Sequence, residues 1–333
     1  MSDLRLFRVK TSPPVELVGR SVALEKSLQT LIEGHLETFL GVRFLATEYS
    51  TGRVHGGRID TLGIDENGCP VIIEYKRATN ENVVSQGLFY LDWLMDHKGE
   101  FELLALKTLG ADVSGAIEWR GPRLLCIAGD FSKYDVHAVQ QMNRNIGLIR
   151  YQKYGDELLL FELVNSVKAS PAENNEQPAS RATKVTLPAS DRATRKEEFA
   201  DASPDLSSRS ATGSQTSWLR EEFANASPEL RDLYEAVKAY LLKLGDDVEE
   251  TWTKRYVAFR RIKNFLCVVL LAHQDKLLLY VKGDPASIRH QEGFTRDVSA
   301  IGHWGSGDIE ITVRSLDDFE QAKPLVHKSY EAS

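Results

Sequence analysis

The sequence predicts an α/β protein in which a mixed sheet is flanked by helices, followed by a smaller α+β domain. Over residues 1–166 the spacing of apolar residues changes repeatedly between a helical and a strand period. The composition changes sharply near Val167, and helix and strand patterns resume near residue 218. We therefore expect one domain at 1–166, a flexible linker at 167–217 and a second domain at 218–333.

The first domain begins with an amphipathic helix, and strand patterns follow it. Ser21–Leu40 carries apolar residues at helical spacing. Three strand patterns come next, and the turn sequence Asp65-Glu66-Asn67-Gly68 separates the last two, which indicates a hairpin. These strands are expected at Arg43–Tyr49, Gly57–Ile64 and Val71–Lys76.

A second helix, a short buried strand, a third helix and a second hairpin complete this domain. They are expected at Asn80–His97, Leu124–Ala128, Tyr134–Asn145, Leu148–Tyr154 and Glu157–Val164. The order of helix, three strands, helix and strand is what places this domain in the mixed α/β class.

The linker stretch consists mainly of Ala, Ser, Thr, Asn, Pro, Lys and Arg. It cannot bury enough apolar surface to offset its ordering entropy. One segment in it, Glu197–Leu206, recurs almost unchanged as Glu221–Leu230. The repeat is either a local duplication of the entry to the next helix or a short docking motif for a partner.

The second domain has helix patterns at both ends and strand patterns between them. The elements are expected at Pro228–Leu244, Phe265–Ala272, Lys276–Lys282, Asp308–Val313 and Asp317–Tyr330.

Composition excludes several classes of protein. The chain has 333 residues, 42% apolar and 27% charged, and a net charge of −7, as in ordinary soluble proteins. Its longest apolar run, Phe265–Ala272, is eight residues, far below the roughly 20 that span a bilayer. The three cysteines are isolated in sequence, which indicates neither a disulfide framework nor a zinc site. We expect a cytoplasmic protein without a membrane segment.

The stretch Gly56–Arg77 carries the residues most typical of a catalytic site. Glu74 and Lys76 are two apart on an apolar strand and therefore project to the same side. Such charges are costly in an apolar strand unless they have partners or a function. Asp60, on the opposing strand, lies within cross-strand reach. Two carboxylates beside a lysine suit Mg²⁺ or Mn²⁺ and phosphodiester hydrolysis, whereas the alternative is a surface ion pair on a hairpin.

Two further features point toward the same site. On the first helix, Glu25 falls inside the apolar face, whereas Glu33 and Glu37 fall outside it and are expected to be solvated. On the helix after Lys76, Gln86 and Tyr90 are four apart and hence adjacent, so that they can point together at the strand of Glu74.

Asp60, then Glu74-Tyr75-Lys76, then Gln86-Gly-Leu-Phe-Tyr90 resemble the PD-(D/E)XK nuclease superfamily, specifically its RecB-like and NucS-like branches. The resemblance covers about residues 16–164. It implies a restriction-endonuclease-like fold and a metal-dependent endonuclease that acts on DNA.

The resemblance also implies roles for individual residues. Asp60 and Glu74 would bind the metal, and Lys76 would act on the nucleophilic water. Glu25 would be the first-helix acid, while Gln86 and Tyr90 would support the site or contact DNA. In NucS-like enzymes the nuclease domain follows a dimerisation domain, whereas here it comes first, so their preference for branched or mismatched DNA is not carried over.

Several neighbouring residues allow two interpretations. Arg58, Arg77 and Arg53 would hold phosphates or be solvated. His55 is expected in a loop before the strand, and Trp93 is expected in the core rather than under a base.

The second domain has a basic stretch at 254–263 interleaved with Tyr256 and Phe259. It is either a nucleic-acid surface or a protected strand edge. Arg255–Tyr330 resembles an uncharacterised bacterial domain of unknown function that is often fused to nuclease-like modules.

The sequence therefore predicts a Mg²⁺-dependent DNA endonuclease whose second domain recruits substrate or a partner. A catalytically inactive binding scaffold and a ligand-regulated sensor are the alternatives. A homodimer is left open.

Overall fold

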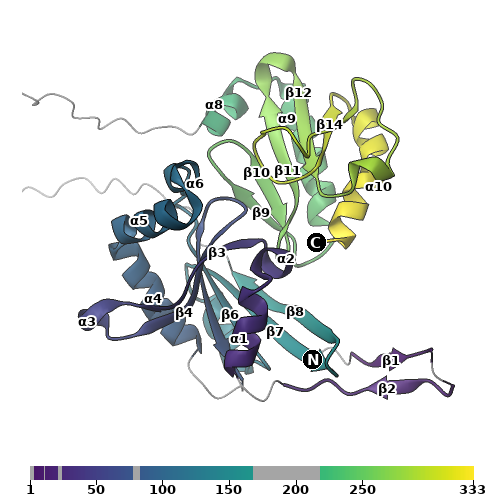
Figure 1. Ribbon diagram of the computed structural model, residues 1–333. Helices are drawn as coiled ribbons and strands as arrows, with labels where there is room; N and C mark the ends of the chain where they lie inside the picture. The colour runs from purple at the N-terminus through teal and green to yellow at the C-terminus, as the bar shows by residue number, and fades with distance from the viewer. Residues whose placement is uncertain (1–3, 11, 22–24, 78–82, 168–217) are drawn as a thin grey trace, which may run out of the picture. The chain divides into compact units, whose positions relative to one another are not determined.

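The computed structural model describes residues 4–10, 12–21, 25–77, 83–167 and 218–333 (Figure 1). The described residues belong to one compact unit, which contains two six-stranded sheets. Val167, the first residue of the predicted linker, still belongs to a strand, and the rest of the linker lies outside the described residues, as does the first copy of the repeated segment. The second copy spans the end of one helix and the start of the next.

The first sheet has the strand order β3-β4-β5-β6-β7-β8. The pairs β3–β4, β4–β5 and β7–β8 are antiparallel, whereas β5–β6 and β6–β7 are parallel. This mixed sheet confirms the predicted fold class. Its strands are β3 (Val42–Ser50), β4 (Arg58–Asp65), β5 (Pro70–Lys76), β6 (Arg123–Ala128), β7 (Asn145–Tyr154) and β8 (Leu158–Val167).

Helices cover both faces of this sheet, because its central strands are buried on both sides. On one face α1 (Glu25–Glu33) and α2 (Leu36–Leu40) pack on Ile73, Tyr75 and Ile127. The opposite face packs against helices that follow β5 and β6. These are α4 (Val83–Asp96), α5 (Lys98–Leu109) and α7 (Lys133–Gln140), and α6 (Ala111–Gly115) follows α5.

Several elements of the first domain differ from the sequence prediction. The expected first helix is interrupted at Gly34-His35, because glycine has a low helix propensity, and it becomes α1 and α2. The expected helix from Tyr134 ends at Gln140, because Asn145 already pairs with Arg123 as the start of β7. The helices α3 (Gly52–His55) and α5 were not predicted.

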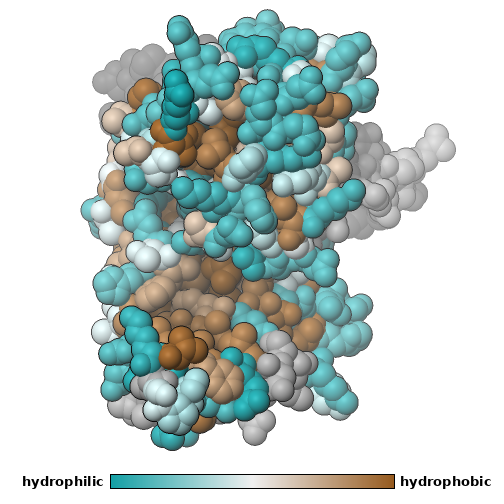
Figure 2. All heavy atoms as spheres, turned by 90° about the vertical axis from the view of Figure 1, so that its right-hand side faces the viewer, coloured by the Kyte–Doolittle hydropathy of each residue, from teal (hydrophilic) through white to brown (hydrophobic). Residues whose placement is uncertain are grey.

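Before the first helix the chain forms a two-stranded ribbon, β1 (Leu6–Arg8) paired with β2 (Val15–Leu17). Two of its apolar side chains, Phe7 and Val15, are exposed. Figure 2 shows apolar surface on this side of the molecule, in the lower half, where β7, β8 and the ribbon lie. The sequence prediction omitted this ribbon because its strands have only three residues each.

The second sheet is antiparallel, with the order β13-β14-β12-β11-β10-β9. It confirms a second, smaller α+β region. Its strands are β9 (Glu249–Trp252), β10 (Val257–Arg260), β11 (Asn264–Leu271), β12 (Lys276–Val281), β13 (Thr295–Asp297) and β14 (Ile309–Val313). Short 3₁₀ turns lie at Ala272–Gln274 and Pro285–Ser287.

Three helices cover one face of the second sheet: α8 (Trp218–Asn225), α9 (Pro228–Leu242) and α10 (Leu316–Glu331). Ser227 caps α9 by accepting the N–H of Leu230, and Pro228 follows at the first helical position. The other face of the sheet buries a smaller cluster around Tyr256, Cys267 and Tyr280.

The turn between β4 and β5 is bound by residues of the second sheet. Asn264 Nδ2 donates to Asn67 Oδ1 at 2.8 Å, and the Tyr256 hydroxyl donates to the same oxygen at 3.1 Å. Glu66 accepts the N–H of Asn264 at 2.8 Å and forms an ion pair with Lys282. The turn is therefore held by side chains from β11, β12 and the segment before β10.

A buried ionic group lies beside this turn. Asp65 Oδ2 accepts from Arg123 Nη1 at 3.1 Å and lies 3.5 Å from Arg260 Nη1. Arg260 also donates to Glu249 Oε2 through two nitrogens, both at 3.1 Å. Two arginines and two carboxylates thus neutralise one another where water has little access.

Much of the basic stretch at 254–263 is engaged in contacts within the protein, whereas Lys254 and Arg255 are exposed. Arg260 is buried, Phe259 lies in the core, and Tyr256 is bound to the turn. Arg261 pairs with Asp247 at 2.7 Å, and Lys263 donates to the carbonyl of Thr38 at 3.0 Å. The sequence could not show this because each contact joins residues far apart in the chain.

We predict that Arg260→Met destabilises the protein strongly, by about 3–5 kcal/mol. The substitution removes the positive charge that pairs with Glu249 and lies near Asp65, and it leaves these carboxylates less well neutralised. Arg261→Met, at the next residue and half-exposed, should cost about 1 kcal/mol or less. Urea unfolding followed by circular dichroism measures both. Equal costs for the two variants would contradict the prediction.

Candidate active site

The candidate site forms where the hydrogen-bond ladder between β4 and β5 ends. The last backbone pair is Thr61 with Ile73. Beyond it, the N–H of Tyr75 donates to Asp60 Oδ2 at 3.0 Å, and the N–H of Asp60 donates to Glu74 Oε1 at 3.2 Å. Each carboxylate therefore takes the place of a backbone carbonyl on the opposite strand, which brings the two acids together.

Glu74 is fully buried, with 0% of its surface exposed. Its Oε2 atom has no hydrogen-bond partner among the described residues. Burial, and then the nearby charge of Asp60, raise the pKa of Glu74 to about 9. Burial also raises the pKa of Asp60, against the opposing effects of the Tyr75 N–H and Lys76. The pair is therefore poised to hold a proton in the absence of a cation.

Lys76 lies beside this pair and is mostly buried. Its Nζ is 3.4 Å from Glu25 Oε1, and Glu25 Oε2 accepts the N–H of Arg77 at 3.2 Å. Glu25 is the first described residue of α1, so the helix directs this carboxylate at the end of β5, as the helical spacing predicts. The structure thus brings Glu25, Asp60, Glu74 and Lys76 into one place.

Gln86 and Tyr90 support the strand that carries Asp60. Gln86 Nε2 donates to the Tyr90 hydroxyl at 3.3 Å, and that oxygen accepts the N–H of Arg58 at 3.2 Å. A Cβ atom at Gly57 would lie 2.6 Å from the Tyr90 ring, so only glycine fits against it. Because Tyr90 is buried, this geometry favours support of the site over contact with DNA.

Glu48 is a member of the site that the sequence analysis missed. It lies between Thr47 and Tyr49, which pair with Thr61 and Ile59, and is therefore opposite Asp60. Its carboxylate is 2.9 Å from Lys26 Nζ and 3.6 Å from Arg58 Nη1. The signal that could have found it is cross-strand register, once the hairpin between β3 and β4 is assumed.

The backbone of Glu48 has a φ of +50°, which is uncommon for a residue other than glycine. Such conformations cost free energy and concentrate at functional sites. Here the conformation interrupts the β3–β4 pairing at Glu48, next to Asp60.

A buried glutamine connects α1 to the backbone of Asp60. Gln29 Nε2 donates to the Asp60 carbonyl at 2.8 Å, and its Oε1 accepts from Lys26 Nζ at 3.1 Å. Glu33 accepts from Thr61 Oγ1 at 2.6 Å, so the expectation that Glu33 is solvated was wrong. Helical spacing alone did not show that β4 offers Glu33 a donor. Glu37, in contrast, is exposed as expected.

The donor set fits a Mg²⁺ or Mn²⁺ ion with two protein carboxylates. Among the residues described, no three His, Cys, Asp or Glu side chains are placed to hold one metal ion. Mg²⁺ is commonly bound through one or two carboxylates together with water and substrate phosphates. Asp60 and the unpartnered, buried Glu74 Oε2 meet that requirement.

The remaining candidates lie around the site. The side chains of Arg53, Arg58 and Arg77 are exposed. The ring centroids of His55 and Phe89 are 5.1 Å apart, and Phe89 is exposed. Trp93 is buried in the core, as the sequence analysis expected, and stacks on His97.

Comparison with known proteins gives similarity in both halves of the chain. Residues 220–333 match the family described as "Domain of unknown function (DUF5655)", which confirms the resemblance expected for this region. An uncharacterized protein of Haemophilus influenzae is 25% identical over 331 residues, covering 98% of this chain and 99% of that protein.

Two solved structures are similar to part of the chain. One is a repair endonuclease from Pyrococcus abyssi, with a TM-score of 0.25, 18% identity, and coverage of 40% of this chain and 50% of that chain. The other is EndoMS in a complex with double-stranded DNA, with a TM-score of 0.23, 18% identity, and coverage of 39% and 47%. The chain thus spans about half the length of these structures.

Along the described parts of the chain, no helix combines the length and the apolar character needed to cross a bilayer.

We predict that Glu74→Gln stabilises the metal-free protein more at high pH than at low pH. Because the native pKa of Glu74 is about 9 and its ordinary value is 4.5, the native state keeps a proton that the unfolded chain releases between these values. Stability of the wild type should therefore fall as pH rises through this range, and the variant should lack that component, which is on the order of 1 kcal/mol or more.

Thermal melting from pH 5 to pH 9 in EDTA measures this difference, with about 2–4 °C expected per kcal/mol. Glu37→Gln, at an exposed carboxylate, is the control and should follow the wild type. If the melting temperatures of the wild type and Glu74→Gln change with pH in parallel, the pKa of Glu74 is not raised and the prediction is wrong.

Proposed function

We propose that this protein is a metal-dependent nuclease that hydrolyses DNA phosphodiester bonds. The observation that carries the proposal is the meeting of Asp60 and Glu74 at the end of a hydrogen-bond ladder, beside Lys76. Two carboxylates that share a buried position repel each other unless a proton or a cation lies between them. A divalent cation would relieve this repulsion and bring a phosphate into the site.

Asp60 and Glu74 would hold Mg²⁺ or Mn²⁺. When bound, such an ion polarises the phosphate and lowers the pKa of a bound water. The chain's own contribution is to fix the two carboxylates: the N–H groups of Asp60 and Tyr75 hold one oxygen of each, which leaves the other oxygens to the ion.

Lys76 would orient or deprotonate the attacking water, or offset charge on the phosphate oxygens. Glu25 keeps the ammonium group at the end of β5 by its contact with Nζ. Because Lys76 is mostly buried, its position varies less than that of a surface lysine. Arg58 and Arg77 lie at the rim, where they would contact phosphates of the DNA.

The second domain, residues 218–333, would recruit substrate or a partner, and we place the protein in the cytoplasm. Its contacts with the Asp65–Cys69 turn support a further task, which is to hold the β4–β5 hairpin in position.

A catalytically inactive scaffold is the alternative from another class. It predicts carboxylates that are separated or neutralised by ion pairs. Glu25 does form such a pair with Lys76, which is the observation in its favour. Asp60 and Glu74, however, contact each other's strands, with Glu74 buried and Asp60 half-buried, which favours catalysis.

Asp60→Asn and Lys76→Met should each reduce DNA cleavage by at least about 100-fold, because each removes a group that acts on the reacting phosphate or water. The assay is cleavage of plasmid and flap DNA with Mg²⁺ or Mn²⁺. Glu37→Gln should cleave at the wild-type rate. If Asp60→Asn and Lys76→Met also cleave at that rate, the assignment is wrong.

Mn²⁺ should raise the melting temperature of the wild-type protein, because the ion binds the native site and not the unfolded chain. An ion at 100 times its dissociation constant adds about 2.7 kcal/mol of stability. Asp60→Asn and Glu74→Gln should each lose most of this shift, whereas Glu37→Gln should keep it. An equal shift in all four proteins would place the ion elsewhere.

A further inference from the structure

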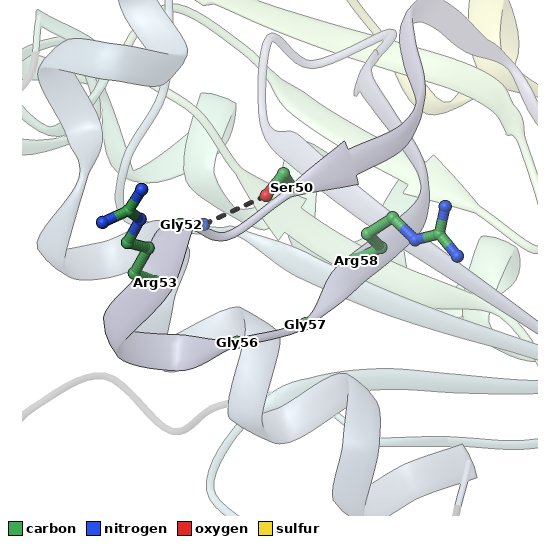
Figure 3. Close-up of a pocket in the computed structure, with 6 residues that line it drawn as sticks. All are labelled: Ser50, Gly52, Arg53, Gly56, Gly57 and Arg58. Atoms are coloured by element: carbon green, nitrogen blue, oxygen red, sulfur yellow. Dashed lines mark hydrogen bonds between the residues drawn. The ribbon is translucent and has the colours of Figure 1, made fainter.

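The arginines around the β3–β4 loop do not form a common anion site. A hollow of about 470 Å³ lies on this loop, and Arg53 and Arg58 are among its lining residues. Figure 3 shows that their side chains are directed to opposite sides of the loop, so they cannot bind one anion together. Basic and aromatic side chains that do converge lie in the second domain, on a surface that the proposed catalytic chemistry does not use.

Two segments that are far apart in the sequence meet at this surface. One is the turn at 253–256 between β9 and β10, which presents Lys254 and Arg255. The other is the glycine-rich loop at 302–307 before β14, which presents Trp304. The Arg255 guanidinium lies over the Trp304 ring, 4.6 Å from its centroid. We call Lys254, Arg255 and Trp304 the tryptophan–arginine surface.

The turn that presents the two cations is fixed by hydrogen bonds. The N–H of Thr253 donates to the carbonyl of Tyr256 at 3.0 Å, and Thr253 Oγ1 accepts the N–H of Arg255 at 3.2 Å. At the start of α8, the N–H of Leu219 donates to the carbonyl of Lys254 at 3.1 Å. The backbone of this turn is therefore ordered before any ligand binds, which reduces the entropy lost on binding.

The position of Trp304 is fixed by its neighbours. Gly305 has a φ of +92°, and a Cβ atom there would lie 2.6 Å from the Cβ of Cys267 on β11, so only glycine lets the loop lie this close to the sheet. The rings of Trp218 and Trp304 form a T-shaped pair with centroids 4.9 Å apart. Although Arg255 and Trp218 both contact it, Trp304 keeps 39% of its surface exposed. The indole is thus supported by the protein and partly open to a ligand.

The two cations of the surface are available to an anion. Arg255 is exposed and makes no ion pair with a carboxylate within the described residues. Lys254 Nζ lies 3.9 Å from Glu118, but this carboxylate also accepts two hydrogen bonds from the Arg120 side chain, and the Lys254 side chain is 60% exposed. Positive charge therefore gathers beside an exposed indole, although the chain as a whole carries a net charge of −7.

This combination fits a single-stranded nucleic acid. Unpaired bases stack on aromatic rings and on the planar guanidinium group of arginine, while lysine and arginine bind the phosphates. In a duplex the faces of the bases are covered by neighbouring bases, so only an unpaired base can stack on such a surface. A purely acidic ligand would use the cations and leave the ring without a role.

From these observations we propose that the tryptophan–arginine surface binds a single-stranded nucleic acid. One base stacks on the Trp304–Arg255 pair, and Lys254 binds an adjacent phosphate. The inference rests on the proposed recruitment of substrate by the second domain and gives that role a ligand and three residues, but it does not depend on cleavage. It assigns a binding site to a region whose matching family is described only as a domain of unknown function.

The test measures binding of a labelled single-stranded DNA to the full chain in EDTA, by fluorescence anisotropy at several salt concentrations. Trp304→Ala should weaken binding by at least about 5-fold, the lower limit for loss of one base–aromatic stack. Trp304→Phe, which keeps a ring, should retain most of the affinity. Lys254→Gln should lower the slope of log affinity against log salt by about 0.7, as loss of one phosphate contact on a single strand does.

Arg255→Lys separates stacking from charge. Because it keeps the positive charge and loses the planar group, it should weaken binding while it leaves the salt slope unchanged. Trp252→Ala is the matched control for the indole, because Trp252 is 40% exposed but packs on Phe223 at the face of the sheet that the helices cover. It should bind like the wild type. Arg144→Gln, at an exposed arginine of the first domain, is the control for charge and should keep the slope.

Single-stranded RNA, duplex DNA and polyglutamate are the further probes. Binding of either single strand that is lost in Trp304→Ala supports the proposal, and the tighter of the two identifies the ligand. The proposal is overturned if the wild type binds no single strand, or if Trp304→Ala and Arg255→Lys bind it as the wild type does. It is also overturned if polyglutamate or the duplex competes as well as the unlabelled single strand, because charge alone would then explain the binding.

Cleavage measured in parallel keeps this proposal apart from the nuclease function. A wild-type protein that binds single strands through Trp304 but never cleaves DNA refutes the nuclease and leaves the surface. A protein that cleaves DNA while Trp304→Ala binds single strands with the wild-type affinity refutes the surface alone.

Discussion

The site depends on one change in hydrogen bonding between β4 and β5. Up to Thr61 and Ile73 the strands pair through their backbones, and beyond that point the carboxylates of Asp60 and Glu74 accept the backbone N–H groups instead. A side chain is longer than a carbonyl bond, so the strands can separate here while their donors stay satisfied. The same contacts that end the ladder bring two acids together in a place with little water. Two negative charges are costly in such a place unless a proton or a cation lies between them.

The opposite end of the same hairpin is fixed by the second sheet. The turn that joins β4 to β5 is bound by Asn264 and Tyr256, and Asp65 lies in a buried ionic group with Arg123 and Arg260. A two-stranded hairpin has little stability by itself, so neighbours at both faces and at its turn determine its geometry. The second sheet thereby contributes to the position of the acids even though its own residues lie at the far end of the hairpin.

Acidic side chains form ion pairs with the lysine and arginine side chains around the site. Glu48 holds Lys26 and Arg58, and Glu25 holds Lys76. Glu48 does so with a positive φ, a conformation that an ordinary strand residue avoids. Each of these positive groups therefore has a counter-charge in the free protein.

Local sequence determined the order of the strands in the first sheet and the members of the main acid pair. Alternating polarity and a turn sequence are sufficient to predict a hairpin with Asp60 on one strand and Glu74 and Lys76 on the other, because the strand period of two is a local property. Helical spacing likewise directed Glu25 toward the sheet. The break at Gly34, the three-residue strands of the N-terminal ribbon and the burial of Arg260 were decided by tertiary contacts. Tertiary contacts also place Glu48 opposite Asp60 and give Glu33 a hydrogen bond from Thr61. A residue's partner across a sheet depends on register and on strands distant in sequence, and no local pattern of apolar residues contains that information.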